Sequence, residues 1–439
     1  MVTPVVSIIG AGLAGCEAAL QLAERGFEVR LYEMRPHTQT PAHQTALPAE
    51  LVCSNSFKSI RLDTGSGLLK AELKLLGSRL LAIAESCAVP AGHALAVDRE
   101  LFSQRVNEAL ETTSGITLIR EELGHIPPGK VIIATGPLTS DAMMQALQDL
   151  LGSHQLFFFD AIAPIVEADS IDYGIVYAKA RYDKGDPDYL NCAFDREQYY
   201  RFVDALVSAE KHEAHEFENA FFRGDKFSFY ENCMPIEELA RRGRDTLRHG
   251  VMRPMGLELP LTGQKAFAVL QLRAENVHRT SFNLVGCQTM LRYPEQKRVF
   301  RLIPGLENAS FLRFGSIHRN AYLNSPELLQ DNLELKQRPE AWIAGQLSGV
   351  EGYVECIASG LLCARILAEN LPLLPEETIL GQLWRRLITP PDKRGFQPVN
   401  ANFGILRPLT NEPREKQLKK EQLSERALDA LKIYLDGQH

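Results

Sequence analysis

The stretch VVSIIGAGLAG at residues 5–15 decides the fold of this chain. A short apolar run, typical of a buried β-strand, leads directly into a glycine turn. Within the turn, Gly10 permits a tight bend, Gly12 lets a ligand approach the backbone, and Gly15 lets the following helix pack closely on the strand. The pattern predicts that the pyrophosphate of a dinucleotide binds against Gly10, Gly12, Leu13, Ala14 and Gly15.

The next residues complete a unit of strand, turn, helix and strand. Residues 16–25 have the spacing of a helix that ends at Gly26, and residues 28–32 form a second strand. That strand ends at Glu33, 18 residues after Gly15, where a carboxylate accepts a hydrogen bond from a ribose hydroxyl of an adenine dinucleotide. Glycine triplets also occur in turns that bind no ligand. The full order of elements is far more specific than the triplet.

Two later segments show the same pattern, an apolar strand followed by a glycine turn. The apolar strand 131–134 runs into Thr135-Gly136, a pattern typical of flavoproteins, and the strand 341–344 runs into Gly345. A helix that begins near residue 353 offers its first N–H groups to a flavin or a phosphate. A further helix is expected over 68–84.

The length of 439 residues exceeds one ordinary hydrophobic core, so two domains are expected. Residues 155–312 contain no second glycine fingerprint, which indicates that a nicotinamide nucleotide binds either transiently or elsewhere. We therefore expect an α/β protein with a glutathione-reductase-type FAD-binding Rossmann domain, built discontinuously from residues 1–154 and 313–439. Residues 155–312 would form an inserted α+β domain.

The composition is that of a globular protein, with 45% hydrophobic and 23% charged residues. No apolar run approaches the length of a membrane span, and Met1 leads directly into the first strand, so we expect a cytoplasmic protein without membrane association. The net charge of −7 excludes a surface that is basic throughout. Two basic patches nevertheless occur, over 241–253 and 385–426. Each is either a polyanion-binding surface or a solvated helix face.

Eight cysteines occur without any CxxC pair, so neither a metal site nor a thioredoxin-type pair is expected. Most are explained as small buried side chains. Cys53 precedes Ser-Asn-Ser, which are good helix-capping residues, and Cys233 precedes Met234-Pro235 and a predicted helix. A thiol near a helix start has greater thiolate character. Cys53 and Cys233 are therefore candidates for catalysis, with simple packing as the alternative.

These segments together resemble one family, the flavin- and folate-dependent tRNA (uracil-5-)-methyltransferases. The resemblance is collinear and essentially full length. It is carried by GAGLAG at 10–15, EMRP at 33–36, TPAH at 40–43, VCSNS at 52–56, VPAG at 89–92, AVDR at 96–99, ATGPLTS at 134–140, DYLNC at 188–192, PIEELARRG at 235–243, YPEQKR at 293–298, HRN at 318–320, GVEGY at 349–353 and GFQP at 395–398. The fingerprint is shared by many flavoproteins, whereas VCSNS and PIEELARRG are much more specific.

The resemblance implies methylation of the T-loop uridine of tRNA to ribothymidine. Methylenetetrahydrofolate would supply the one-carbon unit, and FAD reduced by NADPH or NADH would supply the electrons. Cys233 would add to C6 of the uracil, and Cys53 would act beside the flavin as the base that removes the C5 proton. Cys356 departs from the small residue, such as serine, expected at its position. Further contacts implied are Gly136, Gly345, Val350, Glu351 and Tyr353 for the cofactor, and His318, Arg319, Arg241, Arg242 and Arg244 for the substrates.

Two alternatives stay open. The wobble-uridine modification flavoproteins share the fold, FAD, folate and tRNA, but they are longer and carry an added helical C-terminal domain. The same fold also serves as a non-enzymatic escort of prenylated GTPases that binds no flavin. The intact fingerprint with Glu33 argues against the escort. The expected partners are tRNA and folate, without a membrane or a stable protein partner.

Overall fold

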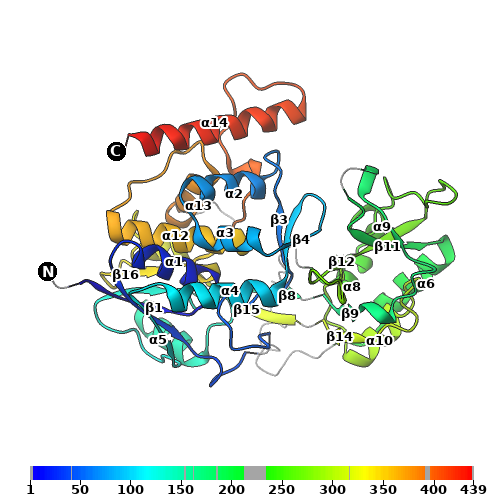
Figure 1. Cartoon of the computed structure of the whole chain (residues 1–439), viewed down its shortest axis with the longest axis horizontal. Coiled ribbons are helices and arrows are strands. Elements are labelled where there is room, and N and C mark those ends of the chain that lie inside the picture. The colour runs from blue at the N-terminus through cyan, green and yellow to red at the C-terminus, as the bar shows by residue number, and fades with distance from the viewer. Residues whose placement is uncertain are drawn as a thin grey trace.

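The computed structural model describes residues 3–40, 42–152, 155–161, 163–183, 186–211, 234–315, 317–390 and 396–437, with only the backbone described for 155–161 and 317–320. Figure 1 shows two groups of elements, one around each of two larger sheets. Among the described residues, no helix is both long and apolar enough to cross a membrane.

The first sheet has five strands in the order β16-β7-β1-β2-β6, and every neighbouring pair is parallel. Its strands are β1 (Val5–Ile9), β2 (Glu28–Glu33), β6 (Ile116–Arg120), β7 (Lys130–Ile133) and β16 (Ala341–Ile343). The central strand β1 is apolar and largely buried because helices cover both faces of a parallel sheet. The order with β1 between β2 and β7 is that of a doubly wound Rossmann sheet, which confirms the predicted class.

Helices pack around this sheet into one hydrophobic core. They are α1 (Leu13–Ala23), α2 (Gly65–Leu75), α3 (Arg79–Ser86), α4 (Arg99–Thr112), α5 (Asp141–Leu151), α11 (Ser325–Leu328), α12 (Tyr353–Glu369), α13 (Ile379–Ile388) and α14 (Lys416–Asp436). The helices α1 and α12 approach closely, since a Cβ atom on Gly360 would lie 2.2 Å from the carbonyl oxygen of Ala14. Two distant parts of the chain thus share one core.

The single helix expected over 68–84 is wrong, because the structure has α2 and α3 there. Gly77 adopts a positive φ of 75°, and the Ser78 side chain accepts a hydrogen bond from the Leu81 N–H to cap α3. A left-handed glycine followed by a capping serine ends one helix and begins the next.

The second large sheet is antiparallel, in the order β10-β11-β12-β13-β9-β14. Its strands are β9 (Ile165–Glu167), β10 (Tyr177–Ala178), β11 (Tyr189–Phe194), β12 (Ala268–Ala274), β13 (Ser281–Leu284) and β14 (Phe311–Arg313). A separate core forms against helices α6 (Arg196–Ser208), α8 (Ile236–Arg241), α9 (Thr246–His249) and α10 (Tyr293–Phe300). This part lies to the right in Figure 1 and combines an antiparallel sheet with helices.

Smaller elements lie between the two groups. Strands β8 (Gln155–Ala161) and β15 (Ile317–Leu323) pair antiparallel where the chain leaves the first group and returns to it. A three-stranded sheet joins β3 (Ser56–Ser59), β5 (Ala94–Val97) and β4 (Ala88–Val89). Short 3₁₀ turns are η1 (Ala168–Ser170), η2 (Arg181–Asp183), η4 (Gln346–Ser348) and η5 (Phe403–Ile405).

Candidate cofactor pocket and active site

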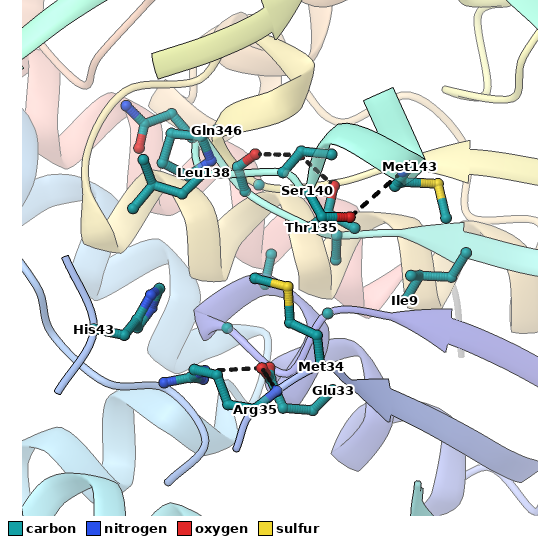
Figure 2. Close-up of a pocket in the computed structure, with 18 of the residues that line it drawn as sticks. Ile9, Glu33, Met34, Arg35, His43, Thr135, Leu138, Ser140, Met143 and Gln346 are labelled. Atoms are coloured by element: carbon teal, nitrogen blue, oxygen red, sulfur yellow. Dashed lines mark hydrogen bonds and ion pairs between the residues drawn. The ribbon is translucent and has the colours of Figure 1, made fainter. Parts of the chain in front are cut away.

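A cavity that opens to solvent lies at the carboxyl ends of the parallel strands, with about 1020 Å³ of empty space when the open solvent is included. This is the edge at which doubly wound sheets bind ligands. Figure 2 shows Glu33, Met34, Arg35 and His43 on one side of it, and Thr135, Leu138, Ser140 and Gln346 on the other. The predicted residues that line it are Gly10, Gly12, Leu13, Ala14, Glu33, Gly136, Gly345 and Tyr353. Gly15, Val350 and Glu351 are not among the residues that line it.

The three glycines of the fingerprint have three different surroundings. Gly10 has a φ of 100°, and a Cβ atom there would lie 2.6 Å from the Ala134 carbonyl oxygen. A Cβ atom on Gly15 would lie 1.9 Å from the Gly10 carbonyl oxygen, so the start of α1 packs against the turn. A Cβ atom on Gly12 would meet nothing within 4 Å. The space beside Gly12 is therefore open, and no side chain caps α1, so its first N–H groups are available to an anion.

Glu33 lies at the centre of a buried polar network. Its carboxylate accepts hydrogen bonds from the N–H of Ala11 at 3.0 Å, and from the N–H and Nε of Arg35 at 3.1 and 2.8 Å. Burial acts to raise the pKa of Glu33, but the hydrogen bonds and charge of Arg35 outweigh it and hold the pKa below its usual value. Glu33 is therefore ionised and can accept a further hydrogen bond from a hydroxyl group in the cavity.

Arg35 is a part of this network that the sequence analysis missed. Its side chain is 2% exposed and forms a second ion pair with Glu50, 3.1 Å away. The sequence feature that could have identified Arg35 is its position two residues after Glu33, inside the EMRP segment. A buried arginine between two carboxylates fixes the position of both.

The Cys53 loop, which we define as residues 52–56, lies next to the cavity. The hydroxyl oxygen of Tyr353 accepts hydrogen bonds from the N–H groups of Cys53 and Ser54, at 2.9 and 3.1 Å. Tyr353 is the first residue of α12 and lines the cavity. Burial raises the pKa of Tyr353, so the phenol stays neutral. The structure thus brings together two predicted site residues that are 300 positions apart in the sequence.

The same loop is also held by the second group of elements. The fully buried amide of Asn55 donates to the carbonyl oxygens of Val97 and Ala274, both at 3.0 Å. Arg273, on β12, donates to the Asn55 amide oxygen at 2.8 Å and to the Ser54 hydroxyl at 3.2 Å. The loop is therefore fixed between the two cores by Asn55, a residue that the sequence analysis did not single out.

A partly buried ion pair lies beside these contacts. Arg99, at the start of α4, forms an ion pair with Glu275, 2.5 Å away, just after β12. Arg99 also donates to the carbonyl oxygen of Leu51 at 2.7 Å. Arg99 belongs to the AVDR segment at 96–99, but no pattern in the sequence indicates that Glu275 is its partner.

The other predicted residues stand as follows. Cys233 lies outside the described residues, and the side chains of His318 and Arg319, on β15, are not described. Arg241, Arg242 and Arg244 are exposed at the end of α8 and just beyond it. Two of these arginines contact carboxylates, Arg244 with Asp204 at 2.5 Å and Arg241 with Glu238 at 3.7 Å. The patch is therefore less positive than the sequence alone suggests.

The remaining described cysteines do not resemble nucleophiles. Burial raises the pKa of Cys16, Cys87, Cys192, Cys287, Cys356 and Cys363, which keeps them as thiols. Of these, Cys356 lines the cavity. Across the part of the chain that the structure describes, no group of His, Cys, Asp and Glu side chains could hold a metal ion.

Comparison with known proteins gives consistent results. The family model described as "Glucose inhibited division protein A" matches residues 5–372. The chain is 50% identical to a protein of Brevibacillus brevis, over 100% of both chains, and 48% identical to one of Bacillus subtilis, over 97% of each. Both relatives are named methylenetetrahydrofolate--tRNA-(uracil-5-)-methyltransferase TrmFO.

A solved structure supports the fold. Aquifex aeolicus GidA superposes with a TM-score of 0.70 at 15% identity, over 98% of this chain and 73% of that one. At such low identity the likeness concerns the fold alone. The sequence identities, in contrast, extend along the whole chain. The chain therefore belongs to the TrmFO family of methylenetetrahydrofolate--tRNA-(uracil-5-)-methyltransferases, within the group described by the glucose inhibited division protein A model.

Proposed function

We propose that this protein methylates C5 of the T-loop uridine of tRNA, with methylenetetrahydrofolate as the one-carbon donor and NADPH or NADH as the source of electrons for bound FAD. The names of full-length relatives that are about half identical support the reaction. The observation that carries the proposal is the position of Cys53, held by Tyr353 at the edge of a dinucleotide pocket.

The residues present fit FAD. Open space beside Gly12 and the uncapped start of α1 suit a pyrophosphate, and ionised Glu33 suits a ribose hydroxyl. When bound and reduced, FAD supplies the electrons that turn the transferred methylene into a methyl group. Gly136, Gly345 and Tyr353 line the remainder of the cavity and would orient the cofactor there.

Two thiols would act on the uracil. C5 of uracil becomes nucleophilic only after a nucleophile adds at C6, and we assign that step to the thiolate of Cys233. Cys53 would then remove the proton from C5 after the one-carbon unit is attached, which restores the double bond as Cys233 leaves. His318 and Arg319 are proposed to contact the substrates.

We also propose that residues 1–154 and 313–439 form the FAD-binding domain and that residues 155–312 form a domain inserted into it. Two separate hydrophobic cores support this division. The pairing of β8 with β15 supports it too, because the chain crosses between the cores at these two strands.

A direct assay tests the function. Purified flavin-containing protein should form ribothymidine in tRNA that lacks it, given methylenetetrahydrofolate labelled in its methylene carbon and NADPH or NADH. Nucleoside analysis should place the label in ribothymidine. Label at the wobble uridine would favour the first alternative family, and colourless protein that binds no flavin would favour the escort.

Replacing Glu33 by alanine is expected to weaken FAD retention by about 1–3 kcal/mol, because a buried charged acceptor is lost. Flavin fluorescence titration of the apoprotein measures this. Glu28→Ala removes an exposed carboxylate from the same strand and should leave the affinity unchanged. Equal flavin affinity in Glu33→Ala and wild-type protein would contradict the assignment.

Replacing Arg241, Arg242 and Arg244 together is expected to flatten the salt dependence of tRNA binding, because fewer counterions are released. The slope of log affinity against log salt should fall by less than three units, since two of these arginines already contact carboxylates. The control is a matched triple substitution of Arg30, Lys74 and Arg105, which are exposed on elements around the first sheet. If both triple variants give the wild-type slope, the patch is only a solvated face.

A further inference from the structure

An exposed tyrosine is fixed in the short turn η2, between strands β10 and β11. Tyr182 is 53% exposed, and its backbone is left-handed, with φ 61° and ψ 25°, which is uncommon for a bulky residue. Its N–H donates to the carbonyl oxygen of Gly256 at 2.8 Å. A Cβ atom on Gly256 would lie 2.6 Å from Cδ1 of Tyr182, so the ring packs directly on the glycine backbone. The ring is therefore held in place while much of it faces solvent.

Arg181 ties this turn to the segment that carries Gly256. Its Nη1 donates to the carbonyl oxygens of Arg253 and Met255, at 2.9 and 2.6 Å, and its Nη2 donates to the amide oxygen of Gln271 at 3.2 Å. Gly256 has a φ of 77°, a conformation that glycine adopts without strain. An aromatic ring that is supported in this way loses little conformational entropy when a partner binds to it.

The arginines beside the ring lack acidic partners. Arg181 donates to neutral oxygen atoms, and within the described ranges no carboxylate lies at ion-pair distance from Arg181 or from the exposed Arg253. The acids Asp183 and Glu258 instead contact Lys179, at 3.4 and 3.7 Å. Burial lowers the pKa of Arg181, and the charge of Arg253 lowers it further, so the two guanidinium groups repel each other. An anion that binds beside the ring would relieve this repulsion.

A rigid ring flanked by uncompensated cations matches the chemistry of an unpaired nucleotide. The base stacks on the ring, and the phosphate lies beside a guanidinium group. An apolar peptide would cover the ring and the exposed Met255 but would leave the arginines uncompensated. A free anion would use the arginines and leave the ring unused. Arg253 is also the last residue of the basic stretch 241–253, which includes α8 and α9.

We infer that Tyr182 and Arg253 bind one unpaired nucleotide of the tRNA, with its base stacked on the tyrosine ring and its phosphate beside the arginine. The inference rests on the proposed function for the identity of the RNA and adds a contact surface to it. Stacking tolerates any base, because every base has a flat aromatic face. The contact therefore adds affinity for the tRNA and does not select the uridine that reacts.

The test is the binding of end-labelled tRNA that lacks ribothymidine to the flavin-loaded protein, measured by fluorescence anisotropy over a range of salt concentrations. Tyr182→Ala should weaken binding about fivefold to a hundredfold without changing the slope of log affinity against log salt, because stacking releases no counterions. Tyr182→Leu, which keeps an apolar side chain, should bind as weakly as Tyr182→Ala. Tyr182→Phe keeps the ring and should bind like the wild type. Arg253→Gln should lower the slope by about one unit.

The matched control is Tyr173→Ala, because Tyr173 is 55% exposed and lies between η1 and β10. Its affinity and salt slope should equal those of the wild type. Tyr182→Trp reports stacking directly, since the native Trp342 and Trp384 are buried. Emission from the introduced indole should be quenched by tRNA and not by heparin, a polyanion without bases.

Three results would overturn the inference. They are wild-type tRNA affinity in Tyr182→Ala, wild-type affinity in Tyr182→Leu, and indole emission in Tyr182→Trp that tRNA leaves unchanged. The first of these would favour a protein partner for the ring. Binding is measured without folate, NADPH or NADH. A wild-type protein that forms ribothymidine while Tyr182→Ala binds tRNA normally would therefore overturn this inference and leave the proposed function intact.

Discussion

A Cys233→Ala variant is expected to keep its FAD and to lose methylation by roughly 10⁴-fold or more, because the thiol that we assign to activation of the uracil is gone. It should also form no covalent adduct with tRNA that contains 5-fluorouridine. Cys53→Ala should lose about 10²–10⁴-fold in rate, as expected for a missing base, yet still form the adduct. Fluorine at C5 cannot leave as a proton does, so trapping requires addition at C6 and attachment of the one-carbon unit at C5 but not the step assigned to Cys53.

Cys356→Ala is the matched control, because Cys356 lines the cavity but burial raises its pKa and keeps it as a thiol. It should methylate and trap tRNA like the wild type. Labelled tRNA followed by denaturing gel electrophoresis measures trapping, and nucleoside analysis measures methylation. A Cys233→Ala protein that still traps tRNA would show that another thiol attacks C6, with Cys53 the next candidate.

Alanine substitutions at two glycines of the fingerprint should have different effects, one on the stability of the protein and the other on its affinity for FAD. Gly15→Ala places a Cβ atom 1.9 Å from a backbone oxygen that cannot move aside. We expect the free energy of unfolding of the apoprotein to fall by about 3 kcal/mol or more. Gly12 has an extended backbone, with φ −80° and ψ −170°, and its added Cβ would meet nothing. Gly12→Ala should therefore fold like the wild type and lose at least about tenfold in FAD affinity.

Denaturant unfolding of the apoproteins and flavin titration separate the two effects. Each variant is the control for the other, since both add one methyl group to the same turn. Unchanged flavin affinity in Gly12→Ala would mean that the pyrophosphate lies elsewhere in the cavity.

The parts of the fold that sequence predicted well are local. The turn between β1 and α1 requires glycines for reasons that act within a few residues, so its pattern is readable. The prediction of one helix over 68–84 is wrong for a reason that is also local. Gly77 is a residue type that commonly ends a helix, and Ser78 is one that commonly begins one. The apolar spacing nevertheless continues through both residues and is typical of one long helix.

The contacts of the candidate site could not be read in this way. Arg273 meets Asn55 across 218 positions, and nothing in either neighbourhood specifies the partner. The same holds for the arginine patch, where Arg244 pairs with Asp204, 40 positions away. Charge runs show where cations occur in the sequence. They do not show which of them the folded chain neutralises.

The hydrogen bonds of Asn55 have a consequence for the order in which the chain becomes structured during synthesis. Residues 52–56 leave the ribosome early, but the Asn55 amide donates to Ala274 and accepts from Arg273, which are made more than two hundred residues later. The neighbouring Tyr353 hydroxyl comes later still. A nascent chain that already contains Cys53 thus lacks the groups that hold its loop until about four-fifths of the protein has been translated. The loop that carries Cys53 is held in place only when β12 and the start of α12 have been made.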